Sequence, residues 1–137
     1  MFFRKKKNNN ETNLVKIGAL LIHAANIDEN YSDKEEQIVK QTLLNLGAEQ
    51  SELDSIIIKA KKIENDANQI LEFTKEIKNL EDNDKIKIIK SLWRIIYSNK
   101  DADIYETNLM RRLAGLLYVD SKLMGDIKEQ IKKENLQ

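Results

Sequence analysis

The sequence predicts an all-α fold, a seven-helix bundle made of two pseudo-repeated three-helix units joined by one further helix. Three observations predict it. Proline is absent and glycine occurs only four times in 137 residues, so few residues interrupt a helix. Apolar residues recur at intervals of three and four, the period of an amphipathic helix, and no strand-like alternation is sustained. The chain also matches itself at a shift of 71 residues, which indicates an internal duplication.

The apolar residues place the seven helices in order along the chain. They form these sets: Leu14, Ile17, Leu21 and Ala25; Ile38, Thr42, Leu43 and Leu46; Leu53, Ile56, Ile57, Ala60 and Ile63; Ile70, Phe73, Ile77 and Leu80; Ile86, Ile89, Leu92, Trp93 and Ile96; Leu109, Leu113, Leu116 and Leu117; Leu123, Ile127 and Ile131. Gly47 suits the end of the second helix. Residues typical of N-terminal caps precede five of the helices: Ser32, Ser51, Asp66, Asn83 and Ser121.

The shift of 71 residues aligns apolar and polar positions together. Leu21 falls on Leu92, and Glu35 falls on Glu106. Helices one to three therefore match helices five to seven, and helix four is the connector. Because one such unit cannot bury its apolar face alone, we predict that the two units pack face to face.

Size and charge limit the classes of function. The length suits one domain, and the absence of cysteine excludes disulfides and zinc–thiolate sites. Residues 1–7 hold four of the 23 basic side chains and no acidic one, so the rest of the chain has more acidic than basic groups. This balance argues against a nucleic-acid partner. No window approaches the 18 apolar residues of a membrane-spanning helix, and we expect a cytoplasmic protein.

Residues 1–10 are predicted to form a basic flexible tail before a helical domain at 11–137. The tail has no secretory-signal hydrophobic region and no apolar helical stripe. A weak membrane-surface anchor is the alternative, because each cation contributes about 1 kcal/mol near anionic lipid. The protein would then be peripheral to the inner membrane. The residues for membrane contact are Phe2, Phe3, Arg4, Lys5, Lys6 and Lys7.

Each unit centres on an oxygen-rich loop, at residues 28–35 and 99–106. Oxygen ligands alternate in both: Asp28, Asn30 and Ser32 in the first, and Asn99, Asp101 and Asp103 in the second. Hard divalent cations favour several oxygens at such spacing. An EF-hand is excluded, because neither loop has glycine at its sixth position or glutamate at its twelfth.

Helix capping explains part of the same pattern. Ser32 and Glu35 form the S-x-x-E sequence of a capping box, and residues 103–106 form a close variant. Carboxylates at these positions also favour the positive end of the helix dipole. Capping does not require Asp28 or Asn99. Two interpretations of the loops therefore stay open. The polar residues either cap helices only, or cap helices and also bind a cation or a partner.

The run of residues 71–120, which includes the Leu92-Trp93 pair, resembles the tellurite-resistance TerB family. That family is similar to the N-terminal domain of the DjlA co-chaperone. Its pattern is a helix ending in Ala-Asp-Gly, a short loop and a glutamate that opens the next helix, present twice. Asp28 and Asn99 stand at the two aspartate places, although neither loop keeps the family's glycine. The resemblance covers about residues 12–134.

The resemblance implies a non-enzymatic protein with a metal-binding acidic surface and a link to tellurite or envelope stress. The divalent metal would be Ca²⁺, Mg²⁺ or Zn²⁺, and its implied ligands are Asp28, Glu35, Asn99, Asp101, Asp103 and Glu106. The pair Asp28 and Glu35 is favoured, because Lys100 adds a positive charge to the second loop. The alternative is a metal-free interaction module, a co-chaperone or a membrane-peripheral adaptor, that binds an unknown protein partner.

The remaining candidates have structural explanations. His23 is the only histidine and cannot build a typical zinc site without cysteine, so we expect a packing or surface role. Trp93 and Phe73 are expected in the core, and the basic run at 59–62 on a solvated face. No nucleophile elbow, phosphate-binding loop or HExxH motif is present. We therefore predict no enzymatic activity, no organic cofactor and no small-molecule substrate.

Overall fold

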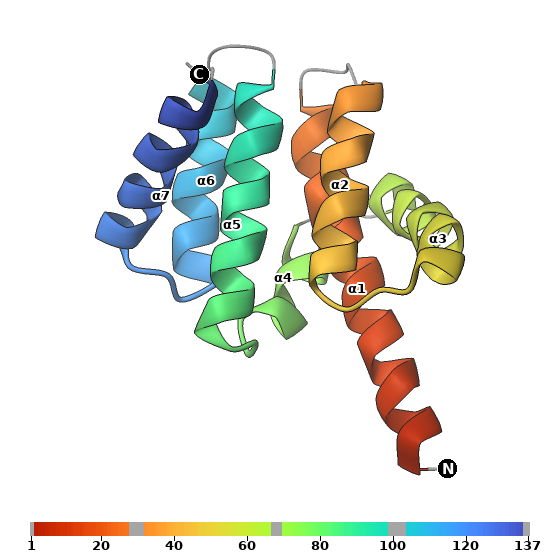
Figure 1. The fold of residues 1–137 in the computed structure, drawn as a ribbon. Helices are drawn as coiled ribbons and strands as arrows, with labels where there is room; N and C mark the ends of the chain where they lie inside the picture. Colours follow the sequence, from red (N-terminus) through yellow and green to blue (C-terminus); the bar gives the residue numbers. More distant parts are fainter. Residues whose placement is uncertain (1, 28–31, 67–69, 99–103, 136–137) are drawn as a thin grey trace.

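In a computed structural model of the chain, the described residues are 2–27, 32–66, 70–98 and 104–135, and they contain helices and no strands (Figure 1). The helices are α1 (Phe2–Asn26), α2 (Asp33–Asn45), α3 (Leu53–Asp66), α4 (Leu71–Ile77), α5 (Asp82–Tyr97), α6 (Ile104–Leu116) and α7 (Ser121–Asn135), with a 3₁₀ turn η1 at Gln50–Glu52. The predicted all-α class with seven helices is confirmed. None of the helices in these ranges combines the length and apolar character needed to cross a bilayer.

Helix α1 is the central element of the packing. It contacts α2, α3, α4 and α5, and α5 contacts α7 and α2 in turn. The centre of α1 is apolar on all sides and buried, which is why it can serve several neighbours at once. The two halves of the chain meet where α2 packs on α5, and there the Thr42 hydroxyl lies 2.5 Å from Ser91 Oγ inside the core.

Small residues bring α1 and α3 close together. A Cβ added to Gly18 would lie 3.1 Å from the Cβ of Ala60. Even an alanine at residue 18 would need the helices to shift by a few tenths of an ångström, and a larger side chain would need more. The close approach therefore favours glycine at residue 18, although glycine is unfavourable inside a helix.

The C-terminal ends of α2 and α6 have the same geometry. Gly47 has φ +110°, and the N–H of the following residue donates to the Leu43 carbonyl at 2.9 Å. Seventy-one residues later, Tyr118 has φ +57°, and the next N–H donates to the Ala114 carbonyl at 2.9 Å. Both ends are the left-handed stop that satisfies free helix carbonyls. The predicted superposition of the two whole units stays a prediction.

Most of the predicted caps are wrong. Ser32 caps α2 as expected, but four other residues lie within helical turns: Ser51, Asp66, Asn83 and Ser121. An N-terminal cap requires an extended backbone as well as a polar side chain. At the starts of α5 and α7, residues next to the predicted ones occupy the cap position. Glu81, with ψ 152°, precedes α5, and the Asp120 carboxylate accepts the N–H of Lys122 at the start of α7.

The segment predicted as a tail is helical. Helix α1 begins at Phe2, and its N-terminal part extends away from the bundle (Figure 1). The buried turns of α1 nucleate the helix, which can then extend toward the N-terminus. Residues 1–17 contain no glycine or proline that would end it. The side chains proposed for membrane contact lie outside the described residues. Mobility of residues 1–10 in solution and membrane contact both stay predictions.

Candidate functional site

The first predicted site contains a complete capping box. The backbone N–H and the hydroxyl of Ser32 both donate to Glu35 Oε1, at 2.8 and 2.9 Å. The Glu35 N–H donates back to Ser32 Oγ at 3.2 Å. The Glu35 side chain is only 1% exposed. These bonds satisfy free N–H groups at the start of α2, so the structural role of both residues is confirmed.

The second site repeats the position of this glutamate. Glu106 is the third residue of α6, as Glu35 is the third residue of α2. It is also buried, with 6% of its surface exposed. The partner expected to complete the second box, Asp103, lies outside the described residues. The two glutamates thus share helix position and burial.

The predicted metal ligands are only partly described. Asp28, Asn99, Asp101 and Asp103 lie outside the described residues. Within the described ranges, no three His, Cys, Asp or Glu side chains gather as a metal site. Glu35 already accepts two hydrogen bonds on one oxygen. A cation at this loop would need further oxygens from residues 28–31, and its binding stays a prediction.

His23 has the packing role expected for it. Its Nδ1 lies 3.3 Å from Glu64 Oε1, and Asn26 donates to the other oxygen of Glu64 at 3.2 Å. The imidazole is also 6.3 Å from the Phe73 ring, centroid to centroid. His23 and Asn26 therefore tie the C-terminal end of α1 to α3.

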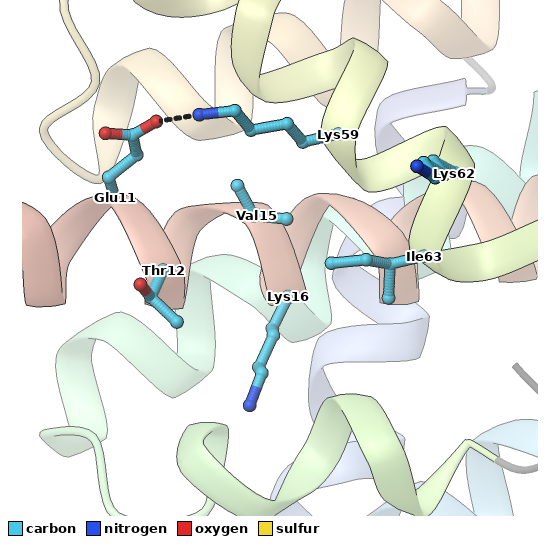
Figure 2. A pocket seen from close by; sticks show the side chains of 7 residues that line it. All are labelled: Glu11, Thr12, Val15, Lys16, Lys59, Lys62 and Ile63. Atoms are coloured by element: carbon cyan, nitrogen blue, oxygen red, sulfur yellow. Dashed lines mark hydrogen bonds and ion pairs between the residues drawn. The ribbon is translucent and has the colours of Figure 1, made fainter. Parts of the chain in front are cut away.

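An open groove of about 430 Å³ lies between α1 and α3 (Figure 2). It was not predicted from the sequence. Val15 and Ile63 provide its apolar surface, and Ile63 is 36% exposed. Its full lining is Glu11, Thr12, Val15 and Lys16 of α1 and Lys59, Lys62 and Ile63 of α3.

The groove is positively charged. Three lysines and one carboxylate line it. Lys59 donates to Glu11 Oε1 at 2.6 Å, which fixes both side chains at one edge (Figure 2). Lys62 forms no ion pair with any carboxylate in the described ranges. The groove therefore combines an apolar surface with a lysine, Lys62, that is not paired with any carboxylate of the described ranges.

The basic run of α3 divides between two faces. Residues 59, 62 and 63 share one helix face at intervals of three and four and line the groove. Lys61 lies on another face and donates to Glu36 of α2 at 2.9 Å. The prediction of exposed lysines was correct, since Lys59 and Lys61 are each about half exposed. The spacing of residues 59, 62 and 63 could have shown that they share one face of α3. It could not show that α1 lies beside that face and completes the groove.

The family model for the tellurite resistance protein TerB matches residues 14–129. The chain belongs to the TerB family. The match confirms the resemblance and includes Glu35, Glu106 and most of the α1–α3 groove. TerB proteins are associated with tellurite resistance, and TerB is not a known enzyme family. No curated protein and no solved structure matches the chain.

Proposed function

We propose that this TerB protein is a non-enzymatic binding module that docks an acidic, amphipathic segment of a partner protein in the groove between α1 and α3. The observation that carries the proposal is the lining of that groove. Val15 and Ile63 offer apolar contact, and Lys62, which pairs with no carboxylate of the described ranges, offers charge complementarity to an acidic partner. An amphipathic helix laid in this groove would bury its apolar side and place its acidic residues at the rim.

The groove lacks the residues that catalysis would require. Its lining holds one carboxylate and no cysteine, histidine or serine. General acid–base or nucleophilic catalysis needs a paired set of such groups at hydrogen-bond distance. The one carboxylate, Glu11, is already bound to Lys59. These features support binding over chemistry.

The sequence is basic just before the groove-lining residues of α1. Residues 1–7 hold four basic side chains and no acidic one, and they precede Glu11 in the chain. An acidic partner longer than the groove would therefore continue toward a basic stretch. This continuity favours an extended acidic segment over a small anion.

The test uses a fluorescently labelled 16-residue helical peptide with leucines along one face and glutamates on the other. Lys62→Glu, which reverses a charge in the groove, should weaken binding roughly tenfold at low salt. The matched control is Lys133→Glu, which reverses an exposed charge on α7, outside the groove. Equal losses in the two variants, or no saturable binding of the peptide, would contradict the proposal.

A second candidate function is binding of a divalent cation at the first loop. It is favoured by the buried carboxylate of Glu35, which is held rigidly at the edge of residues 28–31. Asp28 would supply the second carboxylate, as the TerB resemblance implies. A role in tellurite or envelope stress would then depend on the cation. Melting curves of Asp28→Ala with and without millimolar divalent ion test this site.

A further inference from the structure

A second groove, of about 220 Å³, lies in the other half of the molecule. It is formed by α5, α6 and α7. The Trp93 side chain belongs to it, and it is itself only 2% exposed. Its principal lining is Trp93, Met110, Ala114, Met124, Gly125 and Lys128.

Two residues that line this groove differ in kind from the residues 71 positions earlier. At the shift predicted from the sequence, Leu43 corresponds to Ala114, and Ile57 corresponds to Lys128. Leu43 and Ile57 are both buried in the core. The groove thus has a short side chain and a charged one at two positions where the first half of the chain has large apolar ones.

Gly125 is an exposed residue of the groove lining. A Cβ added to it would meet no atom within 4 Å, so packing does not require glycine there. Glycine is among the least favourable residues inside a helix, and Gly125 lies in the middle of α7. Gly18 differs, because its added Cβ would press on Ala60. A larger side chain at residue 125 can therefore extend over the groove without a clash.

The polar groups at the groove indicate the chemistry of that molecule. Within the part of the chain that the structure describes, the buried indole Nε1 of Trp93 has no hydrogen-bond partner, and such a donor gains from an acceptor that enters the groove beside it. Lys128 Nζ lies 5.6 Å from the centre of the Trp93 ring. Arg111 also lines the groove, is exposed and pairs with no carboxylate of the described ranges. Two cations thus flank an apolar, aromatic surface.

We propose that this groove binds a small amphipathic carboxylate. Trp93, Met110 and Met124 are 2%, 1% and 5% exposed, so its apolar body would enter along their edges at the groove. The two flexible methionines would change rotamer to admit it. Its carboxylate would lie between Arg111 and Lys128, where charge-assisted hydrogen bonds are strong. The volume suits a short chain or a single ring, since an apolar cavity of roughly 150 Å³ holds benzene in another protein. The proposal is independent of the α1–α3 groove, which lies in the other half of the chain.

Trp93 makes the site directly observable, because it is the only tryptophan of the chain. Sodium octanoate titrated into the full-length protein should change its fluorescence saturably. Octanol, with the same chain and no charge, should require roughly tenfold higher concentration if two cations recognise the carboxylate. Acetate, which lacks the apolar body, should have no effect. Equal response to octanol and octanoate would overturn the assignment of the carboxylate.

Two variants decide whether the response comes from the groove. Gly125→Leu should abolish octanoate binding, since it fills free space without strain, and circular dichroism should show an unchanged helix content. Gly115→Leu is the matched control, because Gly115 is also a helical glycine with open space around it and does not line the groove. Arg111→Gln should weaken binding several-fold without changing stability. Wild-type binding by Gly125→Leu would overturn the proposal.

Discussion

Helices α1 and α3 contact each other through small residues, whereas α5 and α7 have large residues at the positions that correspond at the predicted shift of 71 residues. In the first, Gly18 meets Ala60, and the helices approach closely. Seventy-one residues later, both positions hold isoleucine, Ile89 and Ile131, and both are fully buried. Small residues thus close the first crossing, and large residues fill the second.

At two other positions the difference in side-chain size is reversed, and the first unit has the larger apolar side chains. The first unit fills the space between its helices with Leu43 and Ile57, whereas the second has Ala114 and Lys128 at the corresponding positions. A groove lies there in the second unit. Two halves of a chain with similar helix ends and similar apolar periods can therefore distribute their side-chain volume differently. Each half then presents a groove of different chemistry.

The largest expected effect is at the close crossing of α1 and α3. Gly18→Val should lower the free energy of unfolding by about 3 kcal/mol, because the added side chain presses on Ala60. Ala60→Gly in the same chain should recover part of the loss. Gly115→Val, a helical glycine with open surroundings, should be almost neutral. Urea unfolding of the four proteins measures the effect, and an equal loss at residue 115 would refute the close contact.

The two polar loops are compared by melting curves. Ser32→Ala and Asp103→Ala should each lower stability by about 1 kcal/mol, with or without divalent ions, because a helix cap is lost. Asp28→Ala should have little effect in chelator. In millimolar divalent ion it should lose the added stability that a bound cation gives the native state. If Asp28→Ala behaves like wild type in both conditions, the first loop is no metal site.

The two left-handed helix ends should respond with opposite signs. Gly47→Ala should lower the free energy of unfolding by about 1 kcal/mol, because φ +110° is unfavourable for residues with a Cβ. Tyr118→Gly should raise it by about 0.5 kcal/mol, since glycine relieves the strain at φ +57°. The relief is partly offset by loss of the cation contacts of Lys78 and Lys85 with the ring. Loss of stability in Tyr118→Gly would contradict the assigned strain.

The smallest expected effect is a pH-dependent ion pair between α5 and α7. Arg94 donates two hydrogen bonds of 3.1 Å to the Glu134 carboxylate, and this contact holds the pKa of Glu134 below its ordinary value. A lowered folded-state pKa gives stability that is present above the unfolded pKa and is lost as the pH falls through the folded pKa. Glu134→Gln should therefore cost up to about 0.5 kcal/mol at pH 7, because both groups are well exposed. The difference from wild type should vanish in acid.

The fold was largely predictable because local patterns determine it. Apolar spacing alone located the seven helices, and the Ser32–Glu35 pair predicted its own hydrogen bonds, since a capping box involves only neighbouring residues. The starts of α5 and α7 were misplaced, because several polar residues compete there and the backbone conformation decides among them.

The grooves were not predictable, because each depends on residues from different helices. Lys59, Lys62 and Ile63 have visible helical spacing, but only the position of α1 makes them one wall of a groove. Gly125 and Ala114 are ordinary helix residues until α6 and α7 are placed side by side. Tertiary packing, which no local pattern specifies, creates both sites.

Transplanting the packing of the first unit into the second tests the comparison most directly. The double variant Ala114→Leu with Lys128→Ile gives the second groove the side chains found at the corresponding positions of the first unit. Filling free space with apolar groups should raise the free energy of unfolding, measured in urea, by about 2 kcal/mol. It should also abolish the octanoate response of Trp93. A double variant that is less stable than wild type, or that still binds octanoate, would contradict the account.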